Sequence, residues 1–303
     1  MRYRWIAVAL LGVVGLSATA WGEDIAHIGT VNYIEGTAYL QGKLLKQSDV
    51  GSAVLDKGQM LTTGDGRAEL LLTPGVFLRM DKNSAIRMVS SELLQTQIEL
   101  LQGKASVEVD EIHDENDLEV LVGTVRTQML QNGFYEFDAA SPKAMVFKGK
   151  AAVALGNDKY NLIKGSHELA LSDNLRAKPA EFNPTASQDD LYHWSNLRSQ
   201  YLSEANNELA QEYGDTPGFE PGWFWDPYGF DYTYIGMGPM WSPFGFGFFP
   251  PWYGGFYGGF YGGRFGGYYG RRGGFGGVGR PGFGGVGMAH VGGGMHGGGG
   301  AHR

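Results

Sequence analysis

Histidine side chains are the first candidates for chemistry, because imidazole exchanges protons near neutral pH and binds metal ions. The chain has seven: His27, His113, His167, His193, His290, His296 and His302. None belongs to an H-E-x-x-H or H-x-x-x-H pattern, and the sequence contains no G-x-S-x-G nucleophile motif or P-loop. We therefore predict no catalytic residue, no cofactor-binding residue and no metal ligand in the body of the chain.

An acidic run, Asp110-Glu-Ile-His-Asp-Glu-Asn-Asp117, is the other candidate for binding a cation. Calcium loops place oxygen ligands at alternate positions around a glycine turn, and this run lacks that alternation. We interpret it as a solvated hairpin turn.

Two C-terminal patterns look like binding motifs. Gly277-Val-Gly-Arg-Pro-Gly282 fits the letters of a dinucleotide fingerprint. It follows no strand and Pro281 among glycines cannot open a helix, so that site is excluded. The last histidines and two nearby methionines offer the imidazole and thioether ligands that copper or nickel accepts. The sequence leaves open whether metal binds at His290, His296 and His302.

Charge and composition divide the 303 residues into an acidic body and a glycine-rich end. Residues 21–213 carry 28 acidic and 17 basic side chains, a net charge of −11, whereas residues 214–303 carry a net charge of +1. An acidic body is a poor match to a phosphate backbone, so we predict no nucleic-acid partner. The chain has no cysteine, which excludes disulfides, cysteine zinc sites and thiol chemistry.

The N-terminus has the pattern of an export signal. Arg2 and Arg4 precede 12 apolar residues at 5–16, and Ala18-Thr19-Ala20 forms a small-residue cleavage site before Trp21. Twelve residues span about 18 Å as a helix, which is shorter than a bilayer core of about 30 Å. We predict cleavage between Ala20 and Trp21 and a periplasmic or secreted protein that does not span the membrane afterwards. An uncleaved anchor or a buried first helix is the alternative.

The body of the chain, which carries the candidate residues described above, is predicted to consist of β-strands. Short apolar segments with period-two alternation recur from residue 26 to residue 172 and predict a mainly β domain. The expected strands are residues 28–34, 37–40, 59–63, 67–72, 76–80, 85–89, 96–101, 105–109, 118–122, 127–130, 134–138, 143–147, 151–154, 160–163 and 168–171. A roll, a sandwich and a short solenoid all fit this pattern. Five glycines at corners are expected to adopt positive φ: Gly51, Gly58, Gly64, Gly75 and Gly103.

A single amphipathic helix is predicted over residues 187–213, with Ser187 as its N-cap. Apolar residues recur at three- and four-residue steps and form one stripe: Leu191, Trp194, Leu197, Tyr201, Leu202, Ala205 and Leu209. We expect this stripe to pack on the β domain, and docking onto a partner protein is the alternative.

The predicted organisation is a signal peptide at 1–20, a β domain at 21–178, a linker and helix at 179–213, and a low-complexity tail at 214–303. The tail holds 33 of the 50 glycines, interspersed with aromatic residues. Such a composition predicts a disordered extension with no packed core. Adhesion to envelope polymers or self-association through the aromatic rings is the alternative.

Several motifs in the β domain resemble the FecR-domain family. They are Gly29-Thr-Val-Asn-Tyr-Ile-Glu-Gly36, Leu55-Asp-Lys-Gly-Gln-Met-Leu-Thr-Thr-Gly64, Gly66-Arg-Ala-Glu-Leu-Leu-Leu72, Val76-Phe-Leu-Arg-Met-Asp-Lys-Asn-Ser-Ala-Ile86 and Leu101-Gln-Gly-Lys-Ala-Ser-Val107. The resemblance covers residues 26–110 directly, and residues 118–172 are expected to complete the same unit. The whole layout is also similar to exported FecR-domain proteins of acidobacteria that end in an aromatic, glycine-rich tail.

The resemblance implies a periplasmic module that acts through protein contacts. The family's namesake relays a signal in ferric citrate uptake from an outer-membrane receptor to a cytoplasmic sigma factor. Only Met1–Arg4 precede the apolar stretch here, so we do not expect the cytoplasmic arm of the namesake. We predict a non-enzymatic envelope module that binds a protein or a polymer. The alternatives are a signal-transduction regulator of the ferric-citrate type and an envelope polysaccharide hydrolase.

Overall fold

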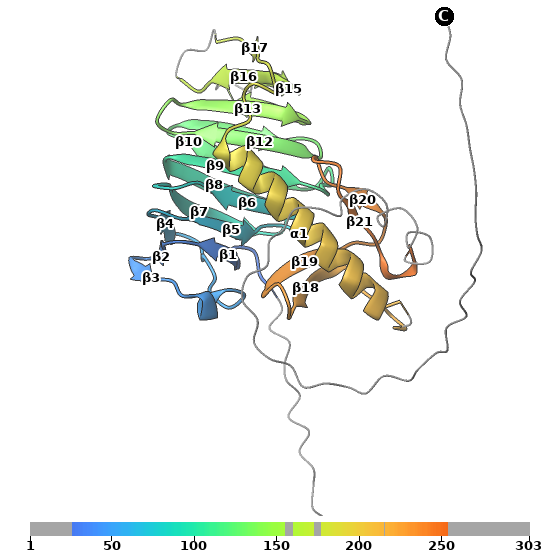
Figure 1. Cartoon of the computed structure of the whole chain (residues 1–303). Helices are drawn as coiled ribbons and strands as arrows, with labels where there is room; N and C mark the ends of the chain where they lie inside the picture. Colours follow the sequence, from blue (N-terminus) through green and yellow to red (C-terminus); the bar gives the residue numbers. More distant parts are fainter. Residues whose placement is uncertain (1–25, 155–159, 173–176, 215, 254–303) are drawn as a thin grey trace, which may run out of the picture. The chain divides into compact units, whose positions relative to one another are not determined.

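A computed structural model describes residues 26–154, 160–172, 177–214 and 216–253. The predicted signal peptide and the last three histidines lie outside these residues. Two large sheets face each other across a hydrophobic core (Figure 1). Sheet I has eight strands in the order β1 (Val31–Glu35), β5 (Arg67–Leu71), β6 (Val76–Met80), β9 (Lys104–Val109), β12 (Gly133–Asp138), β13 (Lys143–Lys148), β16 (His167–Ala170) and β17 (Ala180–Glu181).

Sheet II has nine strands, and it carries the second half of the core. Their order is β15 (Tyr160–Lys164), β14 (Lys150–Ala154), β11 (Val125–Met129), β10 (Asp117–Val122), β8 (Gln95–Gln102), β7 (Ala85–Glu92), β4 (Met60–Thr63), β2 (Ala38–Leu40) and β3 (Lys43–Leu44). The chain crosses between the sheets every one to three strands while it advances along both of them. The fold is therefore a two-layer sandwich, and of the three architectures that the sequence left open the sandwich describes it best.

Most strand pairs are antiparallel, and β8 with β10 is a parallel pair in register Ile98 to Val120. The parallel pair arises because β9 crosses to sheet I between them. All 15 predicted strands overlap an observed strand, and within the two large sheets the strands that were not predicted are β3 and β17.

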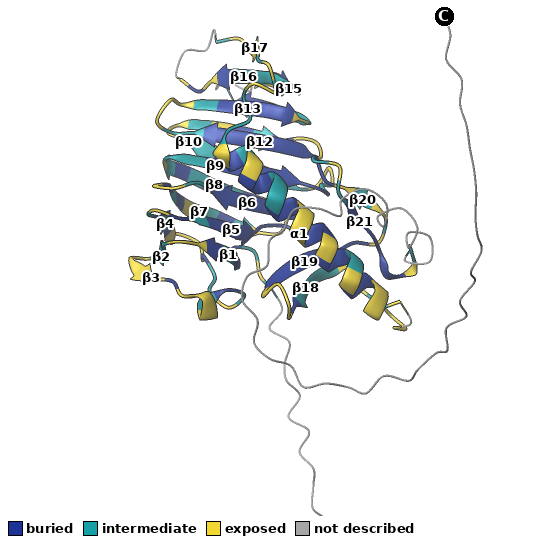
Figure 2. Ribbon diagram, viewed as in Figure 1, coloured by how far each residue is buried: buried dark blue, intermediate teal, exposed yellow. Residues whose placement is uncertain are grey.

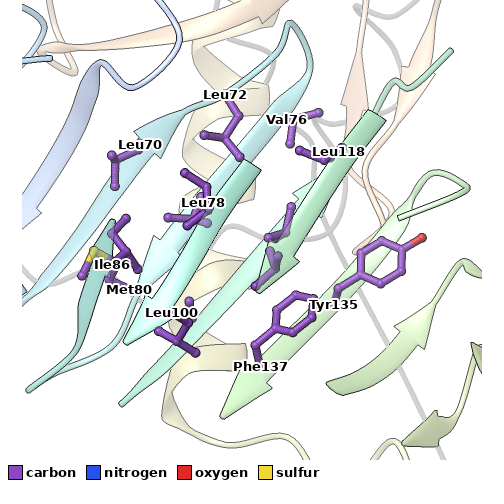
Figure 3. Close-up of a cluster of buried hydrophobic side chains, with 14 of the residues drawn as sticks. Leu70, Leu72, Val76, Leu78, Met80, Ile86, Leu100, Leu118, Tyr135 and Phe137 are labelled. Carbon is purple, nitrogen blue, oxygen red and sulfur yellow. The ribbon is translucent and has the colours of Figure 1, made fainter. Parts of the chain in front are cut away.

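Alternating side chains of the two sheets form the core between them. Leu70, Leu78 and Tyr135 of sheet I and Ile86 and Leu118 of sheet II are buried in this cluster (Figure 3). Period-two alternation sends the remaining residues of each strand to the outer faces. The outer faces of the two sheets differ in what covers them.

The outer face of sheet I is buried as well. Strand β6 shows this most clearly, because all five of its residues are buried. Val76, Leu78 and Met80 belong to the core cluster, whereas Phe77 contacts a separate cluster beneath the C-terminal part of the chain. Figure 2 shows the buried residues running across sheet I behind the helix.

Helix α1 (Asp190–Glu212) crosses the outer face of sheet I (Figure 1). The predicted N-cap at Ser187 is wrong: Asp189 caps the helix, and its Oδ1 accepts a hydrogen bond of 3.0 Å from the backbone N of Tyr192. Leu191, Trp194 and Leu202 are buried, so the prediction that this stripe packs on the β domain is confirmed. Tyr201, which was assigned to the stripe, is exposed instead.

The packed structure continues past the predicted boundary at residue 213. Strands β18 (Gly222–Asp226) and β19 (Asp231–Ile235) form a hairpin, and β20 (Met240–Trp241) pairs with β21 (Gly247–Phe248). Their side chains pack against Leu71 and Phe77 of sheet I and Leu202 of α1. The prediction of a tail without a packed core is therefore wrong for residues 216–253. The prediction used the glycine content of the whole segment 214–303. However, 25 of its 33 glycines lie at 254–303, which is outside the described residues.

Four of the five expected corner glycines have positive φ: Gly51, Gly58, Gly75 and Gly103. Gly64 does not. A Cβ at Gly64 would instead lie 2.6 Å from Oγ1 of Thr37, so close packing accounts for glycine at that corner.

Candidate functional site

Three charged side chains meet on the outer face of sheet I. Glu69, Arg79 and Glu108 come from the adjacent strands β5, β6 and β9 and project away from the core. Arg79 donates from Nε to Oε2 of Glu69 at 2.7 Å and from Nη1 to Oε2 of Glu108. The side chains of all three residues are completely buried. None of the three is among the candidate residues that the sequence pattern indicated.

Helix α1 and strand β19 add three more residues to this group. Arg198 donates from Nη2 to Oε1 of Glu69 at 2.9 Å and to Oδ2 of Asp231 in β19 at 2.6 Å. Ser199 donates from Oγ to Oε1 of Glu108 at 2.6 Å. We call these six residues the buried charge network: Glu69, Arg79, Glu108, Arg198, Ser199 and Asp231. The network joins sheet I, the helix and the C-terminal hairpin.

The charges in the network are balanced by direct contact. Burial by itself raises the pKa of Glu69, but the Arg198 and Arg79 guanidinium groups outweigh it and hold that pKa at about 2. Burial raises the pKa of nearby Asp110, and Glu108 adds to the effect. The acids of the network are hydrogen-bonded to arginine or serine, and their side chains are at most 5% exposed. The arrangement is suited to holding the helix and the hairpin in place.

The outer face of sheet II differs, because its side chains reach solvent. We call this surface the open face. It consists of outward-pointing, half-buried or exposed residues of the central strands: Arg87, Gln95, Gln97, Glu99, Asp117, Glu119, Leu121, Arg126, Gln128 and Lys150. Within the described ranges, no helix crosses this surface as α1 crosses sheet I.

Hydrogen bonds and ion pairs connect neighbouring strands on the open face. Gln97 of β8 donates from Nε2 to Oε2 of Glu119 in β10 at 2.5 Å. An ion pair of 3.4 Å joins Arg87 to Glu99. Partial burial raises the pKa of Glu119, and Gln97 partly offsets that increase. The open face thus carries charges of both signs and several amide groups, which suits recognition by hydrogen bonding.

Strand β15 forms one end of sheet II and borders the open face. Among the described strands of the sheet it pairs with β14 alone. Its side chains Tyr160 and Leu162 are 59% and 54% exposed. An edge strand with apolar side chains offers both backbone groups and side chains to an added strand.

The four histidines of the β domain and helix lie on four different segments: before β1, between β9 and β10, in β16 and in α1. His27, His113 and His193 are exposed and His167 is half-buried. In the described part of the chain, no three His, Asp or Glu side chains gather as metal ligands would. The acidic run is not the hairpin turn that we predicted, because it connects β9 of sheet I to β10 of sheet II, and only part of it is solvated. Asp114 and Glu115 are exposed, whereas Asp110 is buried.

The fold and these surfaces define a two-layer β module. Helix α1 covers the outer face of sheet I, and the outer face of sheet II is exposed to solvent. The family model "FecR protein" matches residues 59–152, which confirms the FecR-type resemblance over that segment. The matched segment runs from β4 to β14 and includes most of the open face. No curated protein matches the chain.

Two crystal structures of candidate anti-sigma factors from Parabacteroides distasonis ATCC 8503 have a distant similarity to this chain. The structure at 2.50 Å resolution has 11% identity and a TM-score of 0.35, with 46% of this chain and 63% of that chain covered. The structure at 1.65 Å has 12% identity and a TM-score of 0.34, with 57% and 81% covered. Across the described residues, no helix combines the length and the apolar character that crossing a bilayer requires.

Proposed function

We propose that this protein is a non-enzymatic FecR-type recognition module that acts in signal transduction at the bacterial envelope. The FecR match over residues 59–152 is the observation that carries this proposal. This match favours a signal-transduction regulator, which the sequence offered as an alternative, and it does not favour a polymer-binding module or a hydrolase. The module acts by binding another protein, in the periplasm if the predicted signal peptide is used.

The open face is the surface that we assign to this binding. Helix α1 and the hairpin β18–β19 occupy the other side of the sandwich through the buried charge network. Arg87 and Arg126 stand beside Glu99 and Glu119 on the open face, so a partner with complementary charges could be selected there. The exposed edge β15 adds a position at which a partner strand can pair.

Site-specific photocrosslinking of the full chain in its native envelope tests this proposal. A photoreactive residue at Gln97 or Gln128 on the open face should yield one common crosslinked protein. The same residue at Gln200, on the exposed side of α1, is the matched control and should not yield it. Equal crosslinking from both sides of the module would refute the assignment of the open face.

A second measurement addresses signalling itself. Deletion of the gene should change transcription of a defined set of genes, and the intact chain should restore it. A chain with Arg87→Glu and Arg126→Glu should fail to restore it while remaining folded. Restoration by that variant, or an unchanged transcript profile after deletion, would contradict a regulatory role.

A further inference from the structure

A pocket of about 360 Å³ opens between the segment that precedes α1 and the outer face of sheet I. Its floor is formed by β12 and β13, and Phe182, Ser187 and Asp189 form the opposite side. The volume falls in the range of sites that bind small molecules or single side chains. The buried charge network does not extend into it.

Two ion pairs flank the pocket. Lys104 of β9 lies 2.8 Å from the carboxylate of Asp189, the N-cap of α1. Lys143 of β13 lies 3.2 Å from the carboxylate of Glu168 in β16. Each lysine is therefore already neutralised by one carboxylate. Their side chains are about one-third to two-fifths exposed, which places both pairs where solvent reaches them.

Glu136 lies between these pairs and has an unsatisfied oxygen. Its register partners are Ser106 of β9 and Met145 of β13, so it points to the same outer face as the pocket. The residue is 6% exposed, and its Oε1 is buried without a hydrogen-bond partner. A buried carboxyl oxygen without a donor costs stability, and a ligand that supplies an N–H would recover that cost.

The charge balance of the pocket selects the sign of the ligand. Glu136, Asp138, Glu168 and Asp189 line it together with Lys104 and Lys143, which leaves a net charge of −2 when all six are ionised. Oδ1 of Asp138 accepts two backbone N–H groups, from Ala140 and Ser141, whereas the buried Oε1 of Glu136 accepts none. The excess of carboxylates would repel an anion, whereas it would attract a cation that has N–H donors.

We propose that this pocket binds a primary ammonium or guanidinium group, which donates to Oε1 of Glu136 between the two lysine–carboxylate pairs. Met145 and Phe182 provide apolar contact for the carbon chain that carries the cation. The cation can belong to a free amine or to a basic side chain of another protein. This inference goes beyond the proposed function, because the pocket lies on sheet I and the open face lies on sheet II.

Binding of a cation should be linked to a proton. Burial raises the pKa of Glu136 to about 8, and Asp189 and Asp81 add to the increase while Lys104 and Lys143 oppose it. Tyr192 of α1 also faces this carboxyl, and its own pKa is raised by burial and by Glu136. A bound cation favours the ionised carboxylate, so binding should release a proton and strengthen about tenfold per pH unit below pH ~8.

Isothermal titration calorimetry of the full chain with agmatine tests the site directly. We expect saturable one-to-one binding that tightens between about pH 6 and pH 8, with proton release visible in buffers of different ionisation enthalpy. Glu136→Gln should weaken binding at least tenfold at the higher pH and remove the pH dependence. Glu99→Gln on the open face is the matched control and should bind as the wild type does.

A second arm identifies the source of the cation. A short glycine–serine peptide with one central arginine should bind if the site accepts a protein side chain, and agmatine alone should bind if it accepts only free amines. Either result supports the site. Absence of saturable binding of both probes to the wild type, or equal affinity and pH dependence in a folded Glu136→Gln chain, would overturn it.

Discussion

Arg198 of helix α1 and Glu69 of strand β5 form a fully buried ion pair, with 2.9 Å between Nη2 and Oε1, although 129 residues separate them in the chain. The guanidinium also reaches Asp231 in β19 and lies 4.0 Å from the ring centroid of Tyr33. One side chain thus connects four elements. Its burial makes the attachment of the helix specific to one position.

Removal of the Arg198 charge should destabilise the protein strongly. Arg198→Met leaves Glu69 and Asp231 buried with less compensation, and breaking a buried pair in this way costs about 3–5 kcal/mol. Urea denaturation at neutral pH measures the difference. Arg126→Met on the open face is the matched control and should change stability by less than about 0.5 kcal/mol. A similar small effect in both variants would show that the network contributes little.

Glu69 should make stability depend on acid pH. Its folded pKa of about 2 lies below the ordinary value of 4.5. The folded state therefore binds fewer protons than the unfolded state in this range, and the stability present above pH 4.5 is lost as the pH falls towards 2. The loss from this group is about 3 kcal/mol. Unfolding free energies of the wild type and Glu69→Gln measured from about pH 5 to pH 2 should converge; parallel curves would contradict this.

Much of the fold was predictable from the sequence, because the strands are short and half of their residues face the core. Period-two alternation located all 15 predicted strands, including β8 and β10 with their alternating burial. Strand β6 carries a different signal: Val76–Met80 is buried on both faces, and a charged residue, Arg79, stands within it. That combination indicates a buried charge and was overlooked.

The C-terminal hairpin should be required for full stability. A chain that ends at Tyr213 lacks Asp231, the second carboxylate of Arg198, and uncovers Leu71, Phe77 and Leu202. A chain that ends at Tyr253 keeps these contacts. Thermal unfolding should show a clearly lower midpoint for the shorter chain, and equal midpoints would restore the boundary that composition suggested.

Gly103 should tolerate substitution less well than Gly58. Both have positive φ, +72° and +82°, so an alanine at either position is strained by about 1–2 kcal/mol. A Cβ at Gly103 would also lie 2.3 Å from Oγ of Ser84 and 2.8 Å from O of Asn83, whereas nothing lies within 4 Å at Gly58. Chemical denaturation of the two alanine variants should show a larger loss of unfolding free energy for Gly103→Ala than for Gly58→Ala. Equal losses would show that the close contacts at Gly103 add nothing to the backbone strain.

The buried charge network and the pocket could not be assembled from the sequence. On α1, Arg198 follows Trp194 by four positions and so lies on the buried face, which was the available signal. Its partners are 33 and 129 residues away, and nothing in local periodicity pairs residues at that distance. Glu136 was hidden for the same reason, because Lys104, Lys143 and Asp189 come from three other segments.

Asn32 and Tyr232 set the order in which this fold can be completed. The side chain of Asn32 bonds both the backbone N and the backbone O of Tyr232, at 2.7 and 2.9 Å, across 200 residues. At a synthesis rate of about 5–20 residues per second, Tyr232 is added roughly 10–40 s after Asn32. Contacts this distant also slow folding. The contact between β1 and β19 is therefore among the last to form, and the outer face of sheet I is completed only after residue 232 has been synthesised.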